Sequence, residues 1–206
     1  MQKFPKRYRG HNHETIGSDI LSLLDAILMP EQVLGKDLTQ RLRAIQPTEW
    51  YPISTLLEPL ELLDRRLGSD SIRKVGIALF KLSHEANVRR SASSARDIIY
   101  GLDGLYRAAN RGADIGGWAV LEFAPGRAVV EKTTPHHCVL EEGILEAALR
   151  TVNVTASIHQ RACFRKGAEA CEMVISSHIV DARWSGRSGG PDSAKARPGG
   201  PPSSRG

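Results

Sequence analysis

The segment Cys163-Phe-Arg-Lys-Gly-Ala-Glu-Ala-Cys171 decides how the fold of this chain is interpreted. Apolar and polar residues alternate along both flanking stretches, and this period is typical of β-strands. The residues between the two cysteines are then the turn of a hairpin. Cys138 lies at the start of a stretch that has the period of an amphipathic helix. All three cysteines of the chain therefore lie within residues 131–172, which we interpret as a metal site.

Cysteines in this arrangement suit zinc, which prefers thiolate and imidazole ligands and also accepts carboxylate. A hairpin can direct the sulfurs of Cys163 and Cys171 at one point, and the dipole of a helix start favours a thiolate at Cys138. The spacing is not that of a standard zinc finger, and buried cysteines are often small apolar core residues instead. The residues alone leave the fourth ligand open among Glu131, His136, His137 and His159.

The composition is that of a soluble globular protein, with 206 residues of which 41% are hydrophobic and 25% are charged. No apolar run approaches the ~20 residues that span a bilayer, and the basic N-terminus lacks the apolar core of a signal peptide. We therefore expect a cytoplasmic protein with reduced thiols and no membrane partner. The net charge of +5 lies mostly at the two ends of the chain, which argues against a nucleic-acid partner.

The pattern along the chain predicts three regions. These are a flexible arm at 1–14, a single ligand-binding domain at 15–180 and a disordered basic Gly/Pro/Ser tail at 181–206. Apolar residues recur at helical spacing in segments at about 15–28, 33–45, 53–67, 72–86 and 95–110. Pro59 falls inside the third segment, where we expect a kink or a helix that begins near Glu58.

After Gly117 the period changes to that of strands, at about 118–123, 128–132, 153–163 and 171–179. A helix is expected between the two strand pairs, at about 136–151, with Thr134 as its cap and Pro135 in its first turn. The predicted fold class is α+β, in which N-terminal helices pack on a small antiparallel sheet with a helix inserted between the strand pairs.

Three stretches carry a resemblance to a known family: Gly126-Arg-Ala-Val-Val-Glu131, Pro135-His-His-Cys138 and Ala162-Cys-Phe-Arg-Lys-Gly-Ala-Glu-Ala-Cys171-Glu172. Together they resemble the 4-vinyl reductase domain of bacteriochlorophyll-synthesis accessory proteins and of phenol-sensing bacterial activators of aromatic catabolism. The wider superfamily includes haem-nitric-oxide-binding proteins and TRAPP vesicle-tethering subunits. The resemblance extends over about residues 112–179, and more weakly over the helices from about residue 52.

The resemblance implies a zinc ion held by three cysteines and one glutamate, which fall here on Cys138, Cys163, Cys171 and Glu131. The loop between the glutamate and the first cysteine is much shorter here than in the phenol sensors, which makes His137 the substitute. A closed set of four ligands is typical of a structural zinc site. The resemblance also implies a hydrophobic pocket between helices and sheet, although residues of these types are more often ordinary core or boundary residues. The candidates are Tyr100, Tyr106, Trp118, Phe123 and His84.

The first functional hypothesis is a stand-alone sensory or carrier domain that binds a small hydrophobic or aromatic ligand. It would dimerise through its N-terminal helices and act on a separate output protein. The second is an accessory role in tetrapyrrole vinyl reduction, and the third is a haem- or nitric-oxide-type sensor with His84 as the axial ligand. No phosphate loop, Ser-His-Asp set or dinucleotide fingerprint is present, so the sequence favours a binding protein over an enzyme.

Overall fold

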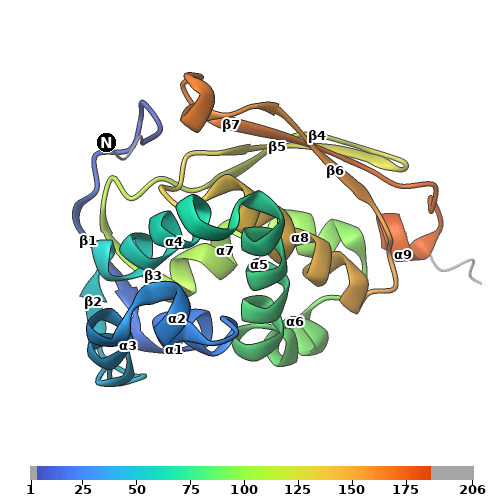
Figure 1. Ribbon diagram of the computed structural model, residues 1–206. Helices are drawn as coiled ribbons and strands as arrows, with labels where there is room; N and C mark the ends of the chain where they lie inside the picture. Colours follow the sequence, from blue (N-terminus) through green and yellow to red (C-terminus); the bar gives the residue numbers. More distant parts are fainter. Residues whose placement is uncertain (1–3, 187–206) are drawn as a thin grey trace, which may run out of the picture.

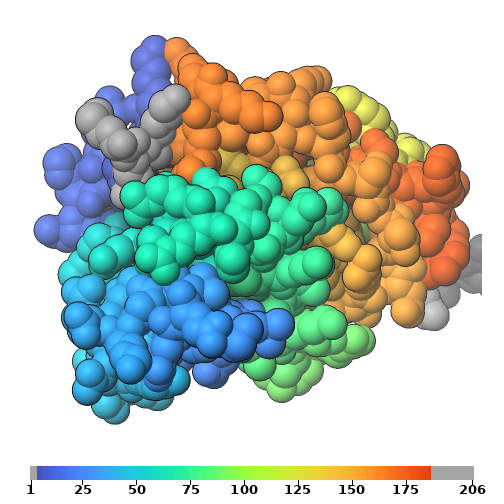
Figure 2. Space-filling model, in the orientation of Figure 1, coloured from blue at the N-terminus to red at the C-terminus, as the bar shows by residue number. Residues whose placement is uncertain are grey.

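Two layers make up the protein: a group of N-terminal helices, and a four-stranded antiparallel sheet that lies over a further helix (Figure 1). The computed structural model describes residues 4–186. In the space-filling view, the blue-to-green N-terminal segments pack directly against the orange C-terminal ones (Figure 2). The α+β fold class predicted from the sequence is confirmed.

A small three-stranded sheet, which the sequence pattern did not reveal, stands at one end of the helical layer. It consists of β1 (His11–Ile16), β2 (Trp50–Pro52) and β3 (Asn110–Ala113), in the order β2-β1-β3 with antiparallel pairing. The prediction of a flexible arm over 1–14 is therefore wrong from His11 onward. Strand pairing on both edges holds β1 in place, and it buries His13 and Thr15.

Seven helices occupy the predicted helical segments, and their bounds differ somewhat from the predicted ones. They are α1 (Gly17–Asp25), α2 (Pro30–Leu34), α3 (Lys36–Arg43), α4 (Ser54–Leu67), α5 (Ser69–Ser83), α6 (Glu85–Ser91) and α7 (Ala95–Ala109). The segment expected to be one helix at 33–45 is divided by Gly35, whose φ of 90° ends α2 and precedes α3. Helix α4 begins at Ser54 and continues through Pro59, so the expectation of a start near Glu58 is wrong.

Helix α7 begins at a capping box. The Ser94 hydroxyl accepts a hydrogen bond from the Asp97 amide, and the Asp97 carboxylate accepts one from the Ser94 amide. Both bonds satisfy amides that a helix start leaves without partners. This fixes the register of α7, which carries Leu102 and Tyr106 inward.

The C-terminal sheet contains β4 (Trp118–Ala124), β5 (Arg127–Lys132), β6 (Ser157–Ala162) and β7 (Cys171–Ser176), in the order β4-β5-β7-β6. Helix α8 (Cys138–Thr151) connects β5 to β6 and lies against the inner face of the sheet, as the sequence predicted. The prediction of Thr134 as the cap of α8 is wrong. The cap is His137, whose ring nitrogen Nδ1 accepts a hydrogen bond from the Val139 amide.

Helices α5 and α8 cross at unusually short range because glycines lie at the crossing. A Cβ atom on Gly76 would lie closer than 3.0 Å to the Leu140 carbonyl oxygen, and one on Gly143 would approach the Arg73 carbonyl oxygen equally closely. Neither position can accept a side chain without moving a backbone. This crossing joins the helical layer to α8 and fixes where α8 begins.

The last described residues are ordered, which corrects part of the predicted tail. Helix α9 (Ala182–Ser185) places Trp184 in the core, where its indole N–H donates to the Ala124 carbonyl at 2.8 Å and its ring stacks on Phe123. The disordered tail predicted over 181–206 is therefore wrong for 181–186, and residues 187–206 lie outside the described part. None of the helices in residues 4–186 has the length and apolar character that crossing a membrane requires.

Candidate metal centre and ligand cavity

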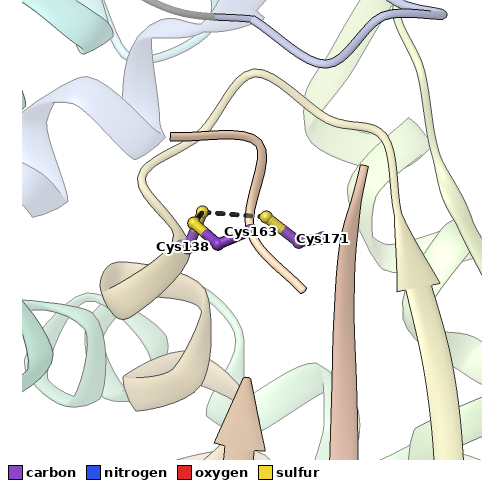
Figure 3. A group of neighbouring side chains, drawn as sticks. All are labelled: Cys138, Cys163 and Cys171. Atoms are coloured by element: carbon purple, nitrogen blue, oxygen red, sulfur yellow. Dashed lines mark hydrogen bonds between the residues drawn. The ribbon is translucent and has the colours of Figure 1, made fainter. Parts of the chain in front are cut away.

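The three cysteines meet in the interior with their sulfurs facing one another (Figure 3). The Sγ atom of Cys138 lies 2.9 Å from that of Cys171 and 3.4 Å from that of Cys163. Cys138 is the first residue of α8, Cys171 is the first residue of β7, and Cys163 directly follows β6. Their convergence agrees with the arrangement expected from the sequence, and all three are buried free thiols.

The hairpin turn between Cys163 and Cys171 is shaped to keep both sulfurs on one side. A short 3-10 helix, η1 (Phe164–Lys166), follows Cys163, whose carbonyl accepts hydrogen bonds from the Lys166 and Ala168 amides. Gly167 then adopts a φ of 106°, a conformation that favours glycine. Phe164 is buried beneath the turn and anchors it to the core.

The thiols influence one another's protonation. Hydrogen bonds from Cys138 and Cys171 lower the pKa of Cys163, whereas the hydrogen bond to Cys163 raises the pKa of Cys138. Hydrogen bonds to the same neighbours also raise the pKa of Cys171. The three sulfurs thus share their protons through these hydrogen bonds. A soft divalent cation would displace the remaining protons, and the donor set fits zinc.

The structure does not bring Glu131 to the cysteines. Side chains alternate along β5, and the core-facing positions belong to Ala128, Val130 and Lys132. Glu131 therefore points to the opposite face of the sheet, where its carboxylate lies 3.5 Å from the guanidinium group of Arg7. This placement does not support the expectation of Glu131 as the fourth ligand.

Of the histidines considered as substitutes, His136 and His137 lie near the cysteines but have other partners, whereas His159 is exposed on β6 at the wall of a neighbouring pocket. The Nδ1 atom of His136 lies 3.1 Å from the Glu141 carboxylate. His137 Nε2 lies 3.2 Å from the Asp64 carboxylate. Within residues 4–186, the group of potential metal ligands at this point contains the three cysteines alone.

Lys132 is a functional candidate that the sequence analysis missed. Its side chain is fully buried, and its ammonium group donates to the His136 carbonyl at 2.6 Å and lies 4.0 Å from the Cys138 sulfur. It also lies 5.2 Å from the centre of the Phe164 ring. The sequence does carry a signal for Lys132, namely a lysine at a core-facing position of an apolar strand. Such a lysine indicates a nearby negative group, because a buried ammonium needs a negative partner.

A cavity of about 50 Å³ lies where the N-terminal helices meet α7, α8 and Trp118 of β4. Three of the five predicted pocket residues, His84, Tyr106 and Trp118, line it. Tyr100 and Phe123 do not: Tyr100 is exposed on the outer side of α7, and Phe123 stacks on Trp184. Apolar side chains form most of the remaining wall: Leu56, Leu79, Leu102, Leu105, Ala109, Leu140 and Ile144.

A histidine–carboxylate pair supplies the main polar group of this cavity. His136 Nδ1 and the Thr134 hydroxyl both lie 3.1 Å from the same oxygen of Glu141, and all three residues are buried. Burial alone would raise the pKa of Glu141, but the bond to His136 and the nearby charge of Lys132 lower it overall. His136 Nε2 has no hydrogen-bond partner among the described residues, so it is available to a bound molecule.

Further polar groups border the cavity. His84 Nε2 lies 3.6 Å from the Asp19 carboxylate, and Tyr106 donates its hydroxyl to the Ile115 carbonyl. Asn110 also lines the cavity, and its Oδ1 atom lies 3.1 Å from the Nε2 atom of His13. His13 was interpreted from the sequence as part of a mobile arm, but burial lowers its pKa to about 4.

Comparison with protein-family models and with curated proteins finds no match. Solved structures do match in fold. A mutant H-NOX protein from S. oneidensis in the Fe(II) ligation state is 17% identical, with a TM-score of 0.63 over 82% of this chain and 99% of its own. The unliganded Fe(II) H-NOX protein from K. algicida is 12% identical, with a TM-score of 0.61 over 80% of this chain and 97% of its own. The chain therefore has an H-NOX-like fold.

Proposed function

We propose that the chain is a small-molecule-binding domain, of sensory or carrier type, which takes its ligand in the cavity between helices and sheet. The observation that carries this proposal is the cavity itself. Its wall is mostly apolar, and a few buried polar groups converge on it, with one nitrogen of His136 unpartnered among the described residues. Binding sites for small molecules typically combine such a wall with a few placed polar groups.

The wall and its polar groups favour a small hydrophobic or aromatic ligand. The cavity of about 50 Å³ is smaller than the ~150 Å³ that accommodates a benzene ring in other proteins. An aromatic ligand therefore requires wall residues to move outward, and the partly exposed apolar ones are Leu105, Trp118 and Ile144. Such movement is a means by which binding could be communicated to a separate output protein.

The three-cysteine cluster would hold one zinc ion in this domain. Bound there, zinc would tie the start of α8 to the β6–β7 hairpin and so support the sheet side of the cavity. The support for zinc is the set of three converging buried thiols, since thiolates are its preferred ligands.

A cavity-filling variant tests the ligand proposal. Ala109 lines the cavity and Ala108 is exposed one residue earlier on α7. Ala109→Leu should abolish the binding of small aromatic probes such as phenol, followed by tryptophan fluorescence and calorimetry. Ala108→Leu should bind them as the unmodified chain does. Equal binding by both variants, or no binding of any apolar probe by the unmodified chain, would contradict the proposed site.

A haem- or nitric-oxide-type sensor is the second candidate, and the similarity to H-NOX structures supports it more directly than the first. His136 and His84 are the histidines that reach the cavity, and the free Nε2 atom makes His136 the better axial donor. A cavity of about 50 Å³ does not fit a porphyrin, so haem requires a large opening of the helices. Titration with hemin decides: a Soret band that His136→Ala removes and His84→Ala retains would establish haem binding.

Dimerisation through the N-terminal helices also stays a proposal. Leu28 and Met29, in the turn between α1 and α2, are the most exposed large apolar residues of that region. Exposed apolar side chains that are adjacent in space often mark an interface. Sedimentation should show a dimer that Leu28→Ser with Met29→Ser converts to monomer; a monomer in the unmodified chain would remove the proposal.

A further inference from the structure

We infer that the cysteine cluster is a metal centre with three protein ligands, whose fourth coordination position is open to a side pocket and accepts a neutral donor. The inference rests on the proposed metal binding and goes beyond it, because a purely structural zinc site is closed by four protein ligands. An open position is instead the arrangement of centres that bind an exogenous molecule.

No fourth ligand of the usual kinds, histidine or carboxylate, joins the cysteines. Glu131 lies on the other face of the sheet, and the inward position beside it belongs to Lys132. Within residues 4–186 no histidine or carboxylate completes the group. His137 is the substitute expected from the sequence. Its Nδ1 atom caps α8, and its Nε2 atom lies beside the Asp64 carboxylate.

The cysteine cluster is accessible from one side. A polar pocket of about 380 Å³ adjoins it, and both Cys138 and Cys163 form part of the pocket wall. A metal held by these sulfurs would lie at the inner end of the pocket. The pocket wall also includes Asp64, Glu142, Gln160 and Lys166.

The charges around the cysteine cluster determine which kind of donor the open position accepts. Three thiolates around a divalent ion leave one net negative charge beside the buried ammonium of Lys132, whose charge also acts on the buried carboxylate of Glu141. Of the charged groups on the pocket wall, Arg165 already pairs with Asp64 and with Glu61, and Glu142 and Lys166 carry opposite charges. An additional anion at the metal would therefore be buried without a counter-charge. A neutral donor, such as water or an imidazole-type nitrogen base, keeps the balance.

Gln160 is the residue that leaves the fourth coordination position open. Gln160 faces inward from β6 into the same pocket, and its buried Nε2 atom has no hydrogen-bond partner among the described residues. An uncharged carboxamide is a weak ligand for a thiolate-bound divalent metal compared with a carboxylate of the same shape. Gln160→Glu would supply that carboxylate with no change of size, and so it is the variant expected to close the centre.

Cobalt(II) substitution of the full chain tests the inference, because Co(II) reports its ligands in the visible spectrum. Thiolate-to-cobalt charge-transfer bands should appear first and show that cysteines hold the metal. Imidazole should then change the ligand-field bands in a saturable manner, whereas azide should not. Gln160→Glu should bind Co(II) with the same charge-transfer bands and lose the response to imidazole. Glu142→Gln, the reverse change on the same pocket wall, should retain it.

The outcomes separate the inference from the proposal on which it rests. Bound cobalt that ignores imidazole in the unmodified chain would overturn the open position and leave metal binding intact. A response to azide as strong as that to imidazole would overturn the preference for a neutral donor. A chain that binds no cobalt would overturn both the metal centre and the inference.

Discussion

The ammonium group of Lys132 lies 4.0 Å from the sulfur of Cys138, and no ion pair in residues 4–186 gives this buried lysine a carboxylate partner. A buried cation is costly unless negative charge lies near it, and the charge of Lys132 already acts on the buried carboxylate of Glu141. Thiolates at the cysteine cluster would add negative charge on the other side of the ammonium group.

Lys132→Met should weaken metal binding. The variant keeps most of the apolar stem and removes the charge that balances the thiolates, so we expect at least about a tenfold loss of affinity, or ~1.4 kcal/mol. Competition with a chromophoric chelator measures it. Lys166→Met, which removes an exposed cation of the neighbouring pocket, should change the affinity far less. Equal affinities in the two variants would show that Lys132 does not stabilise the thiolates.

Cys163→Ser should lose the metal and the stability that the metal provides. At a free metal concentration one hundred times the Kd, binding adds about 2.7 kcal/mol, and for a chain of this size the melting temperature should fall by about 5–10 °C. Metal analysis and calorimetry check both effects. With chelator present, the variant and the unmodified chain should melt at similar temperatures. Retention of one zinc per chain by the variant would exclude Cys163 as a ligand.

His13 should make the protein less stable as the pH falls. Burial lowers its pKa to about 4 in the folded state, whereas the unfolded chain has the ordinary value of about 6.5. The unfolded state therefore binds more protons between these values, and stability is complete above about pH 6.5 and is lost progressively toward pH 4. The loss is at most about 3 kcal/mol.

Urea unfolding across this pH range measures the effect. His13→Gln should flatten the dependence, because an amide can still reach Asn110 but does not titrate. His11→Gln, on the same strand but exposed, should leave the dependence as it is. An unchanged pH profile in His13→Gln would assign the acid sensitivity to other groups.

Trp184→Ala should destabilise the sheet side of the protein. The indole is completely buried, stacks on Phe123 and donates to the Ala124 carbonyl, so its removal should cost about 3–5 kcal/mol. Trp184→Phe keeps the stacking and loses the hydrogen bond, for which we expect a loss of about 1 kcal/mol. Chemical unfolding compares the two. A loss below about 1 kcal/mol for the alanine variant would show that α9 contributes little to the fold.

The convergence of the cysteines could be predicted because it depends on local patterns. A hairpin brings Cys163 and Cys171 together whatever surrounds it, and a helix start after a strand places Cys138 at the same edge of the sheet. The fourth ligand depends instead on which face of β5 each residue occupies. A shift of one residue exchanges the faces, and it is this alternation that separates Glu131 from Lys132.

Other features could not be read from the sequence because their partners are distant along the chain. Strand β1 pairs with short strands at Trp50 and at Asn110, and each partner is too short to show a period of its own. Trp184 lies at the edge of a Gly-, Ser- and Pro-rich stretch, and only the position of Phe123 explains its burial. The cavity likewise depends on how α5 and α8 cross at Gly76 and Gly143.

The segment from Lys132 to Cys138 belongs to both the cavity wall and the cysteine cluster. Lys132 holds the His136 carbonyl and approaches the Cys138 sulfur, while the His136 ring forms part of the cavity wall. A molecule that displaces His136 must therefore also disturb the metal's surroundings. Thermodynamic reciprocity then requires that metal occupancy alter the affinity for the molecule by the same factor. If both proposed sites are occupied, one short segment of this chain would thus make two chemically different sites report on each other.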